Sequence, residues 1–301
     1  MGMCGCNMTN VADLVNEVRR MVYGSMPETL NLIQTSASAG QTSIQLELGV
    51  DGIQKGMLLS SGLNVWFVKG VYSTENTVFV IPGYDGSPEQ AVAAGDKVYV
   101  KPRLTDWYAF GVINNELRKM SSPDNGLYKI GTWVAEVDST YQTYDVPTAA
   151  QGMINLLRVR WRYPATEDVW IDLDPKYYKW VYSSDQNRVR ILIAIPSGTE
   201  IEFTYKAPFT LASTLADDPV ADCGLSETML DIPVLGAAAT LLRTTEARRN
   251  QVTTQGDSRR PEEVSMSANS SIAREVQRQY EQRIQQEMAR LVTRVPIFRG
   301  H

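Results

Sequence analysis

Three stretches of the chain repeat apolar residues every three or four positions, which is the spacing of one face of an α-helix. The stretches cover residues 11–22, 106–120 and about 227–249. Thr9 or Asn10 stands where the first helix needs an N-cap. These patterns predict three amphipathic helices, each of which must bury an apolar stripe against another part of the protein.

A fourth helix is predicted over 271–294, where most steps between apolar residues are four positions long. Its apolar residues are Ile272, Val276, Tyr280, Ile284, Met288, Leu291 and Val292. An α-helix turns once every 3.6 residues, so a stripe built on steps of four drifts around the cylinder. We therefore expect the two ends of this helix to face different neighbours. In the preceding helix, the run Gly236-Ala237-Ala238-Ala239 permits close approach of another backbone.

Between the first three helices the period changes from 3.6 to 2, which is typical of half-buried strands. Short alternating runs separated by glycine-rich turns fill residues 42–100 and predict a small closed or nearly closed barrel. About seven further strand candidates between 128 and 210 predict a β-sandwich. Residues 27–33 are predicted to form one more helical turn.

The order of these elements predicts an α+β fold in which a helical bundle carries two inserted all-β modules and ends in a long C-terminal helix. The expected parts are an N-terminal bundle helix at 1–35, a small β-barrel-like insertion at 36–104, a bundle helix at 105–122, a β-sandwich insertion at 123–215, and C-terminal helices with a tail at 216–301.

Composition is that of an ordinary folded chain, with 43% hydrophobic and 21% charged residues among 301. The net charge of −5 does not attract nucleic acid to the chain as a whole. No apolar run approaches twenty residues and no signal-peptide pattern opens the chain, so neither a membrane span nor secretion is expected. The three cysteines, Cys4, Cys6 and Cys223, suggest a reduced, intracellular protein.

Candidate chemistry is sparse. The single histidine is His301, which excludes most Ser-His-Asp, Cys-His and histidine-metal schemes, and no phosphate-binding or dinucleotide-binding glycine motif is present. We therefore expect no catalytic residues, no cofactor and no metal, and a protein that is not an enzyme.

Acidic residues do gather near aromatic ones between 167 and 178. Glu167 and Asp172 could serve as a pair of hydrolase carboxylates, although alternation along a strand and a turn explains them equally simply. Trp170 and Tyr178 could form a platform that binds carbohydrate, although buried packing is the simpler explanation. The structural explanation is favoured in both cases.

The basic residues of the C-terminal region are all arginine, interspersed with glutamate. One interpretation is a solvated helix with pairs such as Glu275–Arg278 and Glu287–Arg290. The other is a terminal helix that docks into another subunit, since arginine presents a rigid fork of donors that suits carboxylates at interfaces. The predicted interface residues are Arg274, Arg278, Tyr280, Arg283, Ile284, Met288, Leu291, Arg294, Ile297 and Phe298.

Two stretches resemble proteins of tailed bacteriophages. The sequence Thr77-Val-Phe-Val-Ile-Pro-Gly-Tyr-Asp-Gly-Ser-Pro-Glu-Gln-Ala-Val-Ala-Ala-Gly-Asp-Lys-Val is similar to a small β module of phage virion proteins. The usual form of that module has an Arg-Gly-x-x-Gly-Thr turn, where this chain has Pro82 and Ser87 in place of the arginine and the threonine. The run Pro-Val-Leu-Gly-Ala-Ala-Ala, followed by arginine-rich sequence and Tyr280-x-x-Arg283-x-x-x-Glu287-x-x-x-Leu291, resembles the end of head–tail adaptor (connector) proteins.

The resemblance implies a non-enzymatic structural protein of the virion neck, assembled in the host cytoplasm. Such adaptors form dodecameric rings beneath the portal, with C-terminal segments against the portal, a downstream neck or tail protein below, and DNA passing through the lumen without specific binding. Twelve copies at −5 each would carry roughly −60, which suits a lumen to which DNA must not adhere. The alternative is a tail or baseplate protein whose sandwich binds carbohydrate.

Overall fold

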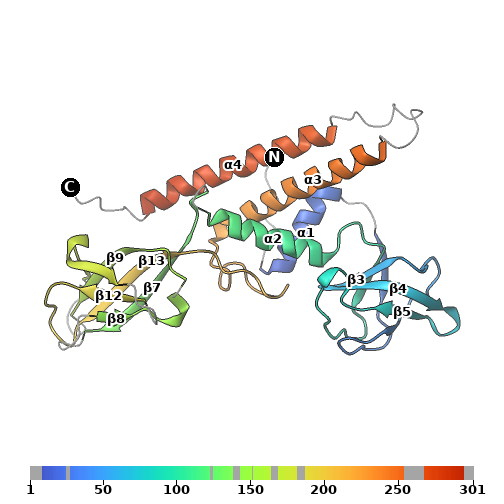
Figure 1. Cartoon of the computed structure of the whole chain (residues 1–301), viewed down its shortest axis with the longest axis horizontal. Helices are drawn as coiled ribbons and strands as arrows, with labels where there is room; N and C mark the ends of the chain where they lie inside the picture. The colour runs from blue at the N-terminus through green and yellow to red at the C-terminus, as the bar shows by residue number, and fades with distance from the viewer. Residues whose placement is uncertain are drawn as a thin grey trace. The chain divides into compact units, whose positions relative to one another are not determined.

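The computed structural model describes residues 9–24, 28–122, 125–137, 143–150, 152–163, 169–181, 187–253 and 268–294. The chain divides into two compact units (Figure 1). Unit 1 takes in residues 1–116, 212–222 and 227–280, and unit 2 takes in 117–211, 223–226 and 281–301.

A curled six-stranded antiparallel sheet forms the β part of unit 1 (Figure 1). Its strands are β1 (Thr29–Leu32), β2 (Ser43–Gln45), β3 (Leu58–Ser61), β4 (Asn64–Tyr72), β5 (Thr77–Ile81) and β6 (Lys97–Val100), in the order β1-β6-β3-β4-β5-β2. The two outer strands meet, because an isolated bridge joins Ile33 to Leu46 and the Gln34 N–H donates to the Gln45 carbonyl at 2.9 Å. The alternate residues that face inward, such as Val78 and Val80, build an apolar core.

The turns of this sheet follow from local chemistry. The 3₁₀ turns η1 (Ser73–Glu75) and η2 (Tyr84–Gly86) lie beside β5, at its beginning and its end. Asn76 closes the first of them with φ at 50°, in the left-handed region that asparagine tolerates better than most residues. Residues 73–86 therefore form a strand, β5, between two tight turns.

Helices complete unit 1. They are α1 (Val11–Tyr23), the first part of α2 (Asp106–Met120), α3 (Asp231–Thr253), which follows the 3₁₀ turn η5 (Glu227–Met229), and the first part of α4 (Ala268–Arg294). The prediction of a helix over 11–22 is confirmed, and Asn10 caps it in a capping box with Asp13. Two further N–H groups of its first turn, those of Val11 and Ala12, donate to carbonyl oxygens of the 212–222 loop.

Unit 2 contains two sheets that share one apolar core, and we call them together the sandwich. The first, in the order β10-β9-β13-β7, consists of β7 (Lys129–Glu136), β9 (Asn155–Arg162), β10 (Ile171–Asp172) and β13 (Glu200–Ala207). The second, in the order β11-β12-β8, consists of β8 (Thr143–Asp145), β11 (Tyr178–Val181) and β12 (Arg188–Ile191), with 3₁₀ turns η3 (Thr148–Ala150) and η4 (Pro175–Tyr177). Phe203 from the first sheet and Val189 from the second lie in the same core.

The prediction of a helical bundle with two inserted β modules is wrong, although the fold remains α+β in broad terms. The described chain is mostly β, with three sheets and four α-helices. The β parts are not insertions that depend on a helical bundle, because each buries an apolar core of its own. Helix α1 also contacts strand β6, where the Arg19 guanidinium lies 4.8 Å from the centre of the Tyr99 ring.

A second correction concerns residues 27–33, which were predicted to form a helical turn. Residues 29–32 form strand β1 and pair with β6, Leu30 opposite Tyr99 and Leu32 opposite Lys97. The short segment is too brief for its own periodicity to decide between helix and strand. Its pairing with β6, far along the chain, makes it a strand.

Candidate functional site

Helix α4 carries most of the residues predicted to form an interface. The apolar members Tyr280, Ile284 and Leu291 are buried within the chain itself. Arg274 and Arg278 are exposed, whereas Arg283 and Met288 are partly buried. The side chain of Arg294 and both Ile297 and Phe298 lie outside the part of the structure that is described. The apolar stripe of the described helix therefore anchors α4, and its exposed arginines form the surface that remains available.

Tyr280 is seated against a glycine of α3. A Cβ atom added at Gly236 would lie 2.9 Å from Cε2 of Tyr280 and 2.6 Å from Oε2 of Glu116. Glu116 is itself buried and accepts a hydrogen bond from Thr240 Oγ1 at 3.3 Å. The glycine predicted to permit close approach does so, although the groups that approach it are side chains of α2 and α4.

Arginine–glutamate pairs run along α4. Arg278 contacts Glu275 at 2.9 Å, and the hydrogen bonds from Arg278 and then Gln279 lower the pKa of the Glu275 carboxyl. Arg290 contacts the buried carboxylate of Glu287 at 2.9 Å, and Arg283 reaches the same carboxylate at 3.3 Å. The pairs predicted for a solvated helix are therefore present, and they leave an outer face on which charges of both signs alternate.

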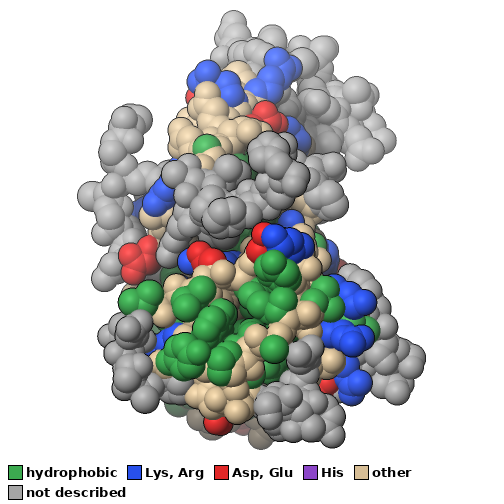
Figure 2. All heavy atoms as spheres, turned by 90° about the vertical axis from the view of Figure 1, so that its left-hand side faces the viewer, with side chains coloured by type: hydrophobic (Ala, Val, Ile, Leu, Met, Phe, Trp, Pro, Cys, Tyr) green, Lys and Arg blue, Asp and Glu red, His purple; other side chains and the backbone are tan. Residues whose placement is uncertain are grey.

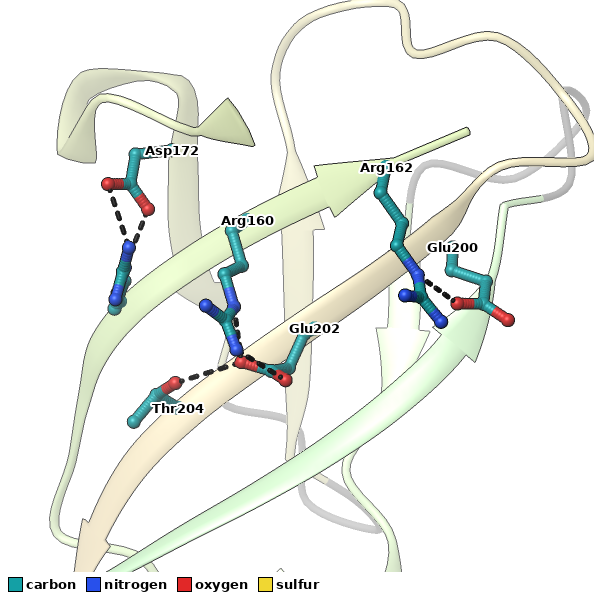
Figure 3. Close-up of polar contacts among 7 residues, drawn as sticks. Arg160, Arg162, Asp172, Glu200, Glu202 and Thr204 are labelled. Carbon is teal, nitrogen blue, oxygen red and sulfur yellow. Dashed lines mark hydrogen bonds and ion pairs between the residues drawn. The ribbon is translucent and has the colours of Figure 1, made fainter. Parts of the chain in front are cut away.

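The four-stranded sheet of the sandwich carries a second charged surface, which we call the charge ladder (Figure 3). Three arginines alternate along β9, and each contacts an acid on a neighbouring strand. The contacts are Arg158 to Asp172 at 2.6 Å, Arg160 to Glu202 at 2.6 Å, and Arg162 to Glu200 at 2.7 Å. Thr204 Oγ1 also lies 3.5 Å from Glu202. Alternation along this part of β9 thus places the three arginines on the charged face and Val159 in the core.

The aromatic side chains proposed as a carbohydrate platform have other partners in this structure. The guanidinium carbons of Arg160 and Arg162 lie 4.8 and 4.7 Å from the centre of the Trp170 ring. Tyr178 is partly buried, and burial followed by the nearby Asp174 charge raises the pKa of its hydroxyl. A sugar that stacks on the face of Trp170 covered by these guanidinium groups would displace their cation–π contacts.

Of the two carboxylates proposed as a hydrolase pair, only Asp172 lies within the described residues. Asp172 is held by a two-pronged contact with Arg158, through Nε at 2.6 Å and Nη2 at 2.9 Å, and Glu167 lies outside the described residues. The backbone N–H of Lys176 and then its ammonium group lower the pKa of Asp174. A general acid needs a raised pKa, so the lowered pKa of Asp174 favours a structural role for that residue.

Across the described ranges, no group of three or more His, Cys, Asp and Glu side chains is placed to hold a metal ion. Within the same ranges, every helix is too short or too polar to span a bilayer.

Two features of the sandwich were not predicted. Large apolar side chains remain exposed on it, namely Val134, Ile154, Tyr163, Val169, Ile171 and Leu192. Figure 2 faces the sandwich and shows hydrophobic side chains gathered on its surface. The second feature is the position of β7 at the edge of its sheet. Alternation along β7 indicates a strand but carries no information on which strands lie beside it.

Comparison of the chain with models of protein families finds no match, and comparison with curated proteins finds none either.

Proposed function

We propose that this chain is a structural virion protein, a head–tail adaptor of a tailed bacteriophage that forms a ring under the portal and joins the capsid to the tail. The observation that carries the proposal is helix α4. Its 27 residues are anchored by a buried apolar stripe, while exposed arginines lie on its outer face. The resemblance of its sequence and of the 77–98 segment to phage virion proteins supports the same assignment.

The contact we propose is polar. Because Tyr280, Ile284 and Leu291 pack within their own chain, they are not available to another subunit. Arg274 and Arg278 are exposed, and a fully exposed surface pair such as Arg278–Glu275 contributes little to stability. Carboxylates of the portal or of a neighbouring copy therefore compete readily for these guanidinium groups, which bind them through two parallel hydrogen bonds.

The proposed assembly is a ring, a dodecamer as the resemblance to adaptors implies, located in the virion neck between the portal and a downstream neck or tail protein. DNA passes through its lumen, and the acidic balance of the chain keeps the duplex from adhering. In this proposal the sandwich and the curled sheet serve as structural modules.

The decisive experiment replaces the exposed arginines of α4. We expect Arg274→Ala with Arg278→Ala to weaken binding to the portal at least tenfold, an effect of about 1.4 kcal/mol, without changing the thermal midpoint of the isolated chain. A control variant, Gln282→Ala with Gln285→Ala, alters exposed residues of the same helix and should bind normally. Binding is measured by mass photometry and by electron microscopy of portal–adaptor mixtures.

Substitution is preferable to truncation here. Removing residues 270–301 would also remove Tyr280 and Ile284 from the core, so lost binding could reflect lost folding. If the arginine variant binds the portal as tightly as the control, α4 is not the docking surface. If the native chain forms no ring with or without portal, the adaptor proposal itself is wrong.

A further inference from the structure

Strand β7 is the longest edge strand in the described sheets. It is eight residues long and pairs along its whole length with β13, and no other described strand pairs with it. The other described edges are limited: β10 has two residues, β8 three and β11 four, and the two outer strands of the curled sheet are joined by the Ile33–Leu46 bridge.

The directions of the backbone N–H and C=O groups of β7 follow from two hydrogen bonds made by Val137. The Val137 N–H donates to the Thr199 carbonyl at 2.8 Å, and the Gly198 N–H donates to the Val137 carbonyl at 3.1 Å. Val137 therefore faces β13. In an antiparallel pair the facing direction alternates from residue to residue. The N–H and C=O groups that point away from β13 belong to Ile130, Thr132, Val134 and Glu136.

This edge has few of the features that block strand addition. Natural edges are protected by proline, by bulges, by short length or by inward-pointing charge. β7 contains no proline, its register with β13 is unbroken, and its lysine stands only at its first position. Val134 is 53% exposed on it. A regular edge of this length, unpaired among the described strands, presents a template for another strand.

We propose that β7 pairs antiparallel with β7 of a second copy of this chain, across a two-fold axis at Thr132. This register places Thr132 opposite Thr132 and Ile130 opposite Val134, and pairs of β-branched residues are favourable. On the other face it places Trp133 opposite Gly131 and Lys129 opposite Ala135. Glu136 meets Tyr128, so no like charges stand opposite each other.

The second copy is the occupant that the residues favour, because the strand complements itself. A shift of the axis by one residue would set Ile130 opposite Glu136 and remove one pair of β-branched residues. In the proposed register two four-stranded sheets join into one continuous sheet. This contact is two-fold, whereas a cyclic ring needs head-to-tail contacts, so the inference stands apart from the proposed function.

Cross-linking tests the register directly. In a chain carrying Cys4→Ser and Cys6→Ser, we expect Thr132→Cys to form a disulfide-linked dimer under mild oxidation. Cα atoms of a hydrogen-bonded antiparallel pair lie about 5.5 Å apart, which a disulfide spans. Glu136→Cys, four residues from the axis, is the matched control and should remain monomeric on a non-reducing gel. Equal cross-linking of both variants, or none at 132, overturns the register.

Loss of one edge donor tests the pairing itself. We expect Thr132→Pro to raise the dimer dissociation constant at least about tenfold in sedimentation velocity, because each copy loses an edge N–H. Thr132→Val keeps that N–H and should sediment like the native chain. Circular dichroism and the thermal midpoint establish that both variants fold. A native chain that sediments only as a monomer, or a proline variant that dimerises like the native one, refutes the proposal.

Discussion

Gly236 lies where α3 faces the carboxylate of Glu116 and the ring of Tyr280. Glycine is a poor helix former, so its place inside α3 costs about 1 kcal/mol relative to alanine. The benefit is space, because both neighbouring side chains occupy the position that a Cβ atom would take. A single missing methyl group thus allows segments distant in sequence to pack.

We expect Gly236→Ala to destabilise the protein by about 1–3 kcal/mol, because overpacking outweighs the gain in helix propensity. The matched control is Gly111→Ala in α2, where nothing lies within 4 Å of the added Cβ. That variant should be neutral or slightly more stable. Urea unfolding of both variants measures the difference, and equal stability of the two would show that the packing at Gly236 relaxes freely.

The side chain of Asp217 stabilises the loop that contains it through hydrogen bonds. Its carboxylate accepts hydrogen bonds from the hydroxyl of Thr214 and from the N–H groups of Ser213 and Thr214, which lower its pKa to about 2. The carbonyl of the same residue accepts the N–H of Val11 at 3.0 Å, at the start of α1. The loop therefore depends on a charged aspartate.

A lowered folded-state pKa stabilises the fold above the unfolded value of about 3.8, and this contribution disappears as pH falls through about 2. We expect Asp217→Asn to be less stable than the native chain at pH 7, and the difference to shrink between pH 4 and pH 2. Thermal midpoints across that range measure it. A gap for Asp217→Asn that stays constant across that range would contradict the assignment.

At the scale of elements, the charge ladder shows that neighbouring contacts of one type differ in environment. The side chains of Arg158 and Asp172 are 42% and 44% exposed, whereas those of Arg160 and Glu202 are 27% and 12% exposed. An exposed pair contributes little, but removing one partner of a largely buried pair leaves a charge without compensation. Arg160 also contacts the ring of Trp170.

We expect Arg160→Met to destabilise the protein by about 1–3 kcal/mol, since Glu202 then keeps its charge in a largely buried position. Arg158→Met, two residues away on the same strand, should cost no more than about 1 kcal/mol. Chemical denaturation compares the two variants. Similar losses from both would mean that burial does not separate these two pairs.

At the scale of the whole molecule, the net charge and the distribution of charged residues decide whether the chain attracts DNA. The chain has 29 lysine and arginine residues against 34 acids, and the arginines of β9 and several of those on α4 lie beside carboxylates. On the residues that the structure describes, such interspersed charge does not favour a continuous basic surface that could track a phosphate backbone.

We expect the purified chain to bind duplex DNA no more tightly than the weak limit of ordinary non-specific binding, a dissociation constant of about 10⁻⁴ M at physiological salt. Fluorescence anisotropy with a labelled duplex measures this across a salt series. The same measurement on the assembled ring tests whether the lumen repels DNA. Micromolar binding that weakens steeply with added salt would contradict an adaptor through which DNA merely passes.

Periodicity in the chain was sufficient for much of the local structure. Apolar spacing placed α1 and α2 within about a residue of their bounds, and alternation located most strands of both units. These features depend on neighbours a few positions apart. The surface pairs along α4 followed from the same rule, because residues three and four apart on a helix lie side by side.

Contacts between distant segments settled the rest. Tertiary packing buried Tyr280 and Ile284, made residues 29–32 a strand, and left β7 at a sheet edge. A stripe of apolar residues indicates that one face of a helix is buried, but it does not indicate which other surface buries it. Identical alternation is compatible with a central strand or an edge, because strand order depends on hydrogen bonds between segments that are far apart in the chain.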